Sequence, residues 1–494
     1  MATIVNPSLF SWNNVEARSD LDRFYLVRDN LPDGKIIRAL EDFRGRGRDD
    51  FPVRAMWNAV IGGVVFQHDS IESLIRELSR NPAFLEACGF DILPRQRKPV
   101  AELKRNEQTA EMEIVYSRPD PAYYAVPESW NFSRFLKNVI ELEETRSMVT
   151  GMIQQLREQL MEELPDFGRH LGYDGKAIDS YSTGQENKET GETSDSDADW
   201  GKHETKGIDN KSGKPWSKVK SWFGYALHLI ADTHHEIPVA MHVTPASASE
   251  QPELRSMIHE TFEQTPELAE RCNDFTADRG LDCSETKALL WDEYDIRPVI
   301  DTRELWREEK AEPGYDPAKP ITRPLYPDRV DTIVYTEKGT VHCICPVTEE
   351  KRDMAFHGFE SDRNTLKYRC PAAAYGFGCK GREQCAVLGQ VNAGEYGRIV
   401  RINITKENRR IFTPTPYGSP SWNRKYNRRS SLERINSRID NSFGFEKHFI
   451  RGKWKMQTRV GLAIAVMMAM ALGHVKAGRI DQMRSLVRPV ALAA

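Results

Sequence analysis

The order of elements predicted between residues 167 and 300 constrains the fold more than any other feature of the chain. Dense β-branched, aromatic and aliphatic residues indicate the strands, and longer mixed segments indicate the helices. In order, we expect strands over 169–174, 222–231 and 237–243, a helix over 252–265, a strand over 275–277, a helix over 284–293 and a strand over 297–300. Three strands followed by alternating helices and strands predict an α/β domain with helices packed on a sheet.

The chain around this segment predicts further domains, because 494 residues are too many for one hydrophobic core. Residues 1–165 have apolar positions at helical spacing and predict a mainly helical N-terminal domain, which could bind DNA, hold a dimer or only pack on the rest. The predicted domains are then 166–300 for the first α/β part, 301–395 for an insertion, 396–475 for the second α/β part and 476–494 for a tail. The second part is expected to resume with a strand over 400–404 and to continue in one helical stretch from Ser430 through Gly473.

Composition favours a soluble protein in the cytoplasm. Hydrophobic residues make up 39% and charged residues 29% of the chain, as in globular proteins. The first residues lack the basic-then-apolar pattern of a signal peptide. The longest apolar run, 460–473, is shorter than the ~20 residues that cross a bilayer, so we expect a buried core helix and no membrane partner.

The net charge of −4 hides a strong asymmetry along the chain. Residues 398–459 carry sixteen Lys and Arg against four Asp and Glu, whereas residues 185–199 carry six acids against one Lys. The basic segment predicts a phosphate-binding face, and the alternative is a solvated helix surface.

Three acidic residues suit a divalent metal site. Asp174 and Asp278 follow short apolar strands, where a sheet presents side chains to a ligand, and Glu433 lies on a predicted helix. Two Mg²⁺ ions ~3.5–4 Å apart, held by a few carboxylates, cleave phosphodiesters. A single Asp at a strand end is more often a cap or a turn residue, so the argument depends on all three acids together. Asp179 is the alternative first acid, and Asp174 is preferred because a Gly follows it.

At these residues the chain resembles the DDE transposases of bacterial insertion sequences. The resemblance is carried by Asp174-Gly-Lys-Ala-Ile-Asp, by residues 223–251, by Ala277-Asp278-Arg279-Gly280 and, ahead of the domain, by Gly45-Arg46 and residues 70–89. The family's C-terminal signature is Tyr, Arg, Glu and Lys at fixed spacing, and Tyr426, Arg429 and Glu433 match its first three positions. Asp440 stands where the family has Lys, and Leu281 stands near a frequent aromatic position.

The resemblance implies an RNase H-like mixed sheet with flanking helices, interrupted by the insertion and preceded by the helical domain. It implies that Asp174, Asp278 and Glu433 bind two Mg²⁺ or Mn²⁺ ions. An activated water would cut at the end of the element, and the freed 3′-hydroxyl would attack target DNA. Double-stranded DNA is then the partner, and a homodimer would hold two ends.

The same resemblance implies that Tyr426 and Arg429 hold DNA near the scissile phosphate, since the Arg fork binds phosphate at two points. Arg434 or Arg438 could supply the cation that Asp440 lacks. Two alternatives remain open: a metal-dependent DNA nuclease without strand transfer, and a DNA-binding relative without catalysis.

Five of the eight cysteines cluster in the insertion. Four thiolates suit tetrahedral Zn²⁺. The expected zinc ligands are Cys345, Cys370, Cys379 and Cys385, with Cys343 as the fifth cysteine of the cluster. Reduced thiols without a metal are the alternative, because the spacing is looser than in paired Cys-x-x-Cys knuckles.

Overall fold

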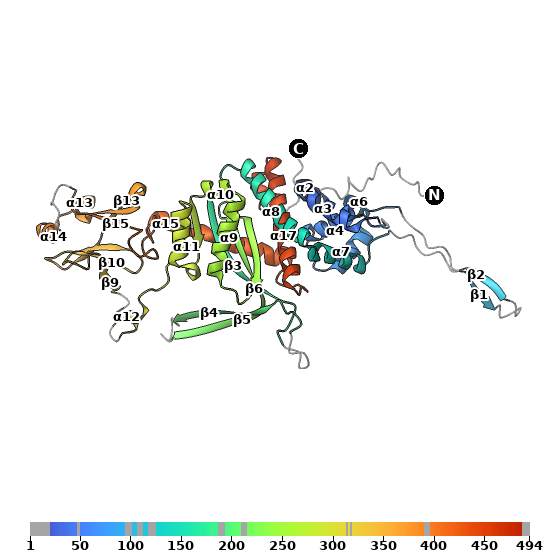
Figure 1. Cartoon of the computed structure of the whole chain (residues 1–494), viewed down its shortest axis with the longest axis horizontal. Helices are drawn as coiled ribbons and strands as arrows, with labels where there is room; N and C mark the ends of the chain where they lie inside the picture. The colour runs from blue at the N-terminus through green and yellow to red at the C-terminus, as the bar shows by residue number, and fades with distance from the viewer. Residues whose placement is uncertain are drawn as a thin grey trace, which may run out of the picture.

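The computed structural model describes residues 20–46, 50–93, 101–105, 112–116, 125–185, 193–208, 215–312, 315–316, 319–389 and 396–486. Figure 1 shows three regions along the long axis of the molecule. The Cys-rich insertion lies at one end, the N-terminal helices lie towards the other, and a sheet with its helices lies between them.

The central sheet is built from β3 (His170–Asp179), β5 (Pro215–Asp232), β6 (Ile237–Pro245), β7 (Asp274–Ala277) and β8 (Arg297–Ile300). β6, β5 and β3 are antiparallel neighbours, and β7 and β8 continue the sheet parallel to β3. Three antiparallel strands followed by two parallel ones, in this order, form an RNase H-like sheet. The predicted fold class is therefore confirmed.

One strand of this sheet was not predicted. β4 (Asp199–Ile208) pairs with the first half of β5, which begins seven residues earlier than expected, and both project beyond the sheet in Figure 1. The polar residues of β4 lack the apolar alternation of a half-buried strand, so the sequence does not indicate it. Part of the acidic stretch before it, residues 186–192, lies outside the described residues.

The helices that flank the sheet are α9 (Glu250–Gln264), α10 (Pro266–Arg271), α11 (Ser284–Ala288) with η3 (Leu289–Glu293), α15 (Pro420–Tyr426), η5 (Asn427–Arg429), α16 (Ser430–Ser437), η6 (Arg438–Ser442) and α17 (Lys453–Lys476). The prediction of one helical stretch from Ser430 through Gly473 is wrong. The chain leaves the helix after Ser442 and returns at Lys453, and Gly444 and Gly452 between them have φ of 74° and 92°. This left-handed backbone favours glycine and ends helices.

The N-terminal helices are α2 (Asp20–Asn30), α3 (Gly34–Arg44), α4 (Val53–Val65), α5 (Ile71–Arg80), α6 (Pro82–Cys88), α7 (Ser129–Glu141) and α8 (Glu143–Glu163). The helical prediction missed an antiparallel hairpin of β1 (Ala101–Arg105) and β2 (Met112–Tyr116). The buried side chains of these helices and those of the central sheet form one continuous hydrophobic core. The predicted division at residue 165 therefore does not separate two cores.

Helix α17 joins these two parts. It packs against α2, α4 and α8 on one side and against β6 on the other. By length and composition it could cross a membrane, but 94% of its most apolar window is buried inside the protein. The expected buried core helix is confirmed.

The insertion contains a four-stranded sheet of β9 (Thr322–Pro324), β10 (Ile333–Thr336), β11 (Val341–Ile344) and β12 (Lys351–Asp353), and a three-stranded sheet of β13 (Ala355–Glu360), β14 (Thr365–Arg369) and β15 (Ile399–Asn403), with α12 (Arg307–Ala311), α13 (Pro371–Tyr375) and α14 (Arg382–Leu388). It has a hydrophobic core of its own, which includes Ile402 and Phe412. The predicted return to the α/β domain at residue 396 is wrong, because β15 pairs with β14 inside the insertion.

Candidate functional site

Strand β3 places Asp174 on the face of the sheet that α16 covers. Its side chain is about one-fifth exposed and accepts a hydrogen bond from the amide of Asn436 on α16, at 2.8 Å. Two residues earlier, a Cβ at Gly172 would lie 2.6 Å from the Thr276 hydroxyl and 3.2 Å from Leu432 of α16. Glycine at this position therefore lets the helix approach the strand that carries the acid.

The pairing of β3 with β7 places Asp278 beside Asp174. The strands run parallel with His170 opposite Asp274 and Gly172 opposite Thr276. Continued by two residues, this register sets Asp278 opposite Asp174, and neighbouring strands are about 4.8 Å apart. The Asp278 carboxylate also accepts a hydrogen bond from the Gly280 N–H at 2.8 Å, which holds the turn after β7.

Helix α16 brings Glu433 to the same place. The Arg429 guanidinium, just before the helix, lies 2.9 Å from the Glu433 carboxylate and 3.9 Å from that of Asp174. One cation thus contacts two of the three predicted acids. The third, Asp278, lies within electrostatic range of both Asp174 and Arg429.

A fourth acid, Glu250, was not predicted. It is the first residue of α9, and a Cβ at Gly175 would lie 2.4 Å from its Oε1, so Glu250 packs on β3 from the face opposite Asp174, within electrostatic range of Asp174 and Asp278. Burial and the nearby Asp278 raise its pKa. An acid in the first turn of a helix usually only complements the helix dipole, which is why its sequence position carries no clear signal. We call Asp174, Asp278, Glu250 and Glu433 the acidic cluster.

Negative charge in the acidic cluster exceeds the positive charge around it. Burial raises the pKa of Asp174 to about 6; Arg429 lowers it, while Asp278, Glu250 and Glu433 raise it further. Carboxylates that converge with too few counterions are the hard oxygen donors that Mg²⁺ and Mn²⁺ prefer. Within the part of the chain that the structure describes, no three His, Cys, Asp or Glu side chains are grouped closely enough to hold a metal as they stand. The residues fit the metal by chemistry, and binding requires the acids to move closer together.

Asp179, the alternative first acid, lies at the far end of β3. Five residues of extended strand separate it from Asp174 by roughly 16 Å. Its neighbour there is His448, in the segment before α17. The geometry therefore favours Asp174 over Asp179.

Tyr426 and Arg429 lie at the edge of the acidic cluster. The Tyr426 ring stacks on Trp422 with centroids 4.5 Å apart, and Arg429 lies 6.0 Å from the centroid of Tyr426. The residue before it, Lys425, forms an ion pair with the fully buried Asp274 of β7. This pair fixes α15, and therefore Tyr426, against the strand that leads to Asp278.

Arg434 and Arg438 have a different partner from the DNA that the sequence predicts. Both pair with Glu236 in the turn between β5 and β6, at 2.8 and 2.6 Å, and Arg484 of the tail adds a third contact at 3.1 Å. The Arg438 side chain is 17% exposed and paired with Glu236, so its predicted contact with DNA would require this pair to open. We call these four residues the Glu236 cluster.

Asp440, at the position of the family Lys, forms an ion pair with Lys176 of β3. Lys176 lies two residues after Asp174, on the same face of the strand. A cation is therefore present beside the acidic cluster, but it comes from the sheet instead of the helix.

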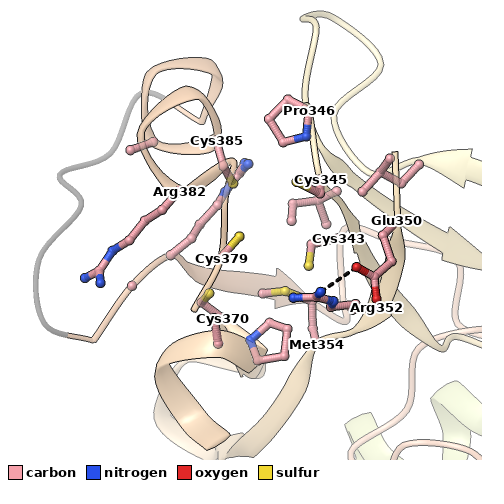
Figure 2. A pocket seen from close by; sticks show the side chains of 17 residues that line it. Cys343, Cys345, Pro346, Glu350, Arg352, Met354, Cys370, Cys379, Arg382 and Cys385 are labelled. Atoms are coloured by element: carbon pink, nitrogen blue, oxygen red, sulfur yellow. Dashed lines mark hydrogen bonds and ion pairs between the residues drawn. The ribbon is translucent and has the colours of Figure 1, made fainter. Parts of the chain in front are cut away.

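The predicted zinc ligands lie in the insertion, apart from the acidic cluster. Cys345, Cys370, Cys379 and Cys385 line one cavity, together with Cys343 (Figure 2). All eight cysteines are free thiols, and Cys88, Cys272 and Cys283 are buried as expected.

The comparisons with known proteins bear on this region. A family described as "Transposase DDE domain" matches residues 189–355, a range that includes Asp278 and Glu250 and excludes Asp174 and Glu433. No curated protein matches the chain. A solved structure described as "Cryo-EM structure of piggyBac transposase synaptic complex with hairpin DNA" covers 95% of this chain and 79% of its own, at 12% identity and a TM-score of 0.35, too low to support any argument about the arrangement here. The resemblance to DDE transposases is confirmed by the family match over residues 189–355.

Proposed function

We propose that this chain is a DNA transposase of an insertion sequence, which cuts at the ends of its element and joins the 3′-hydroxyl to target DNA. The observation that carries the proposal is the register that sets Asp174 beside Asp278, with Glu433 held over them by α16. The transposase DDE domain match supports the same reaction class.

The acidic cluster would hold Mg²⁺ or Mn²⁺ through Asp174, Asp278 and Glu433, with Glu250 adding negative charge from the opposite face of β3. Such ions activate the attacking hydroxyl and stabilise the leaving oxygen of a phosphodiester. Their charge would also offset the carboxylate of Asp174, whose pKa is raised by burial and further by Asp278, Glu250 and Glu433.

The residues around the acids position DNA in this proposal. Arg429 would turn from Asp174 and Glu433 to a phosphate oxygen once metal ions neutralise both carboxylates. Tyr426, held by its stack on Trp422, presents an aromatic face and a hydroxyl beside that phosphate. Two such sites, from two copies of the chain, would hold two element ends in one complex. We propose the cytoplasm as the place of action.

The test is an assay of cleavage and strand transfer on a supercoiled plasmid that carries the gene for this chain with its flanking DNA. Wild type is expected to release the element and to join it to a second plasmid in Mg²⁺ or Mn²⁺. Asp174→Ala, Asp278→Ala and Glu433→Ala are each expected to bind the DNA and not to cut it.

Other outcomes separate the remaining functions. Cutting without joined products would identify a nuclease and overturn the proposal of strand transfer. DNA binding without cutting by the wild type would identify a relative without catalysis. Near-normal cutting by any one alanine variant would remove that residue from the metal site.

A further inference from the structure

Five cysteines from separate segments of the insertion surround one cavity of about 50 Å³. Two come from the end of β11 and the turn after it, one from the residue before α13, and two from the turn before α14 and from α14 itself. In that order they are Cys343, Cys345, Cys370, Cys379 and Cys385. Figure 2 shows side chains from opposite sides of the cavity directed towards one another. The fold therefore gathers thiols that are up to forty-two residues apart in sequence.

Polar groups lie around the sulfur of Cys345. The backbone of Val347, Thr348 and Gly381 and the Thr348 hydroxyl are near enough to lower the pKa of this thiol to about 7. A Cβ at Gly381 would lie 2.8 Å from this sulfur, so glycine allows the approach. Cys379, two residues before Gly381, lies within electrostatic range of Cys345 and Cys370. Gly381 therefore brings the turn that carries Cys379 against the turn that carries Cys345.

The other thiols lie close to these two. Cys343 is within electrostatic range of Cys370, Cys379 and Cys385. Cys385 lies 3.3 Å from the Thr332 hydroxyl, which accepts a hydrogen bond from the Arg398 guanidinium at 2.9 Å. Polar groups that orient ligand atoms from behind are a usual feature of metal sites.

We propose that four of these five thiolates bind one structural Zn²⁺ ion. Four Cys ligands in a tetrahedron are a common structural zinc site, with Zn–S distances of about 2.3 Å. The ion would tie the four-stranded sheet, through Cys343 or Cys345, to the segment after β14 and to α14. The insertion has a small core, and a small core gains much of its stability from such a crosslink.

The sulfurs must move inward to coordinate the ion. No three His, Cys, Asp or Glu side chains among the described residues are grouped closely enough to hold a metal as placed. A cysteine sulfur moves by rotation about a single χ angle between staggered positions, so the change needs no rearrangement of the sheets.

The test is the zinc content of the purified full-length chain, measured by elemental mass spectrometry, with each of the five cysteines changed to Ser in turn. Wild type is expected to carry one zinc per chain, four of the five variants to lose it, and one to keep it. The matched control is Cys283→Ser outside the cavity, where Ser keeps the N-cap of α11, and it is expected to keep its zinc. Wild type without zinc, or zinc retained in two or more of the five variants, would overturn the proposal.

A second measurement covers variants that fail to fold. Wild type is alkylated with iodoacetamide before and after treatment with 1,10-phenanthroline, and the modified cysteines are mapped by mass spectrometry. Four insertion thiols are expected to react only after the chelator removes the zinc. Equal reactivity before and after, or disulfides between these cysteines, would contradict a zinc site.

Discussion

Two charged clusters share the short helix α16, and they differ in how their charges are balanced. In the Glu236 cluster, one carboxylate pairs with three guanidinium groups, and its pKa is lowered by the arginines although burial alone would raise it. In the acidic cluster, Arg429 contacts two of the four carboxylates, and burial together with the neighbouring acids raises the pKa of Asp174. Cations therefore outnumber the carboxylate in the first cluster, whereas carboxylates outnumber the cation that contacts them in the second.

This difference in charge distinguishes a cluster that stabilises the fold from a cluster that suits a functional site. A buried carboxylate that is paired with cations stabilises the fold, because loss of its partners leaves a buried charge unpaired. An unbalanced cluster of acids lowers stability unless a cation binds, and strongly shifted pKa values gather at functional sites for this reason. The comparison predicts opposite consequences when each cluster loses its central carboxylate.

The largest effect is expected for Asp174→Asn. The change removes a metal ligand worth several kcal/mol in the transition state, so plasmid cleavage should fall by roughly a thousandfold or more. Thermal unfolding at neutral pH should occur at the same or a higher temperature, because the raised pKa of Asp174 shows that its charge is unfavourable in the folded state. Asp179→Asn, on the same strand, is the control and should cut normally. A large loss of stability in Asp174→Asn would remove the contrast between the clusters.

The reverse pattern is expected for Glu236→Gln. Three arginines lose their counterion, and the free energy of unfolding should fall by about 2 kcal/mol, less than for a fully buried pair because Arg434 and Arg484 are about half exposed. Denaturant unfolding measures the loss, and Glu309→Gln in the more exposed pair with Arg323 should change stability by less than about 1 kcal/mol. Cleavage at a temperature where the variant is folded should remain near wild type. A variant that is stable but inactive would move Glu236 into the catalytic site.

Glu250→Gln tests whether Glu250 acts together with the other three acids of the acidic cluster. If Glu250 assists the metal, cleavage should fall about tenfold to a hundredfold, the range for groups that support metal ligands. Raising the Mg²⁺ concentration should recover part of the loss, since the substitution keeps the shape of the side chain. Unchanged rates at limiting Mg²⁺ would reduce the cluster to three acids.

The smallest effect concerns pH. Burial would raise the pKa of Asp274, but hydrogen bonds from His170 and Lys425 hold it below 3.8, its ordinary value. A lowered folded pKa stabilises the protein above the unfolded value, and this contribution is lost as the pH falls through the folded pKa. Unfolding measured between pH 5 and pH 2 should therefore be less steep with pH for Asp274→Asn than for wild type. Parallel curves would show that this pair does not fix α15 to β7.

The sequence predicts those parts of the site that depend on local pattern. Asp278 follows the short apolar strand β7 as predicted, whereas Asp174 lies in the middle of β3 and not at its end; the parallel pairing of the two strands still brings the acids together. Features that depend on a distant partner could not be predicted. The strand over 399–403 has a normal strand pattern, but nothing local shows that it pairs with β14. Arg438 has the charge for a phosphate contact, yet the fold sets Glu236 against it across 202 residues of sequence.

The most direct test of the acidic cluster is iron-directed cleavage of the protein backbone. Fe²⁺ with ascorbate and peroxide replaces Mg²⁺ and cuts the chain near the bound ion, and mass spectrometry maps the cuts without any need for the DNA sequence. The cuts should fall near Asp174, Asp278 and Glu433, disappear in excess Mg²⁺ and in Asp174→Asn, and persist in Glu236→Gln. Cuts elsewhere, or cuts near these acids that neither Mg²⁺ nor Asp174→Asn suppresses, would contradict a catalytic metal site in the acidic cluster.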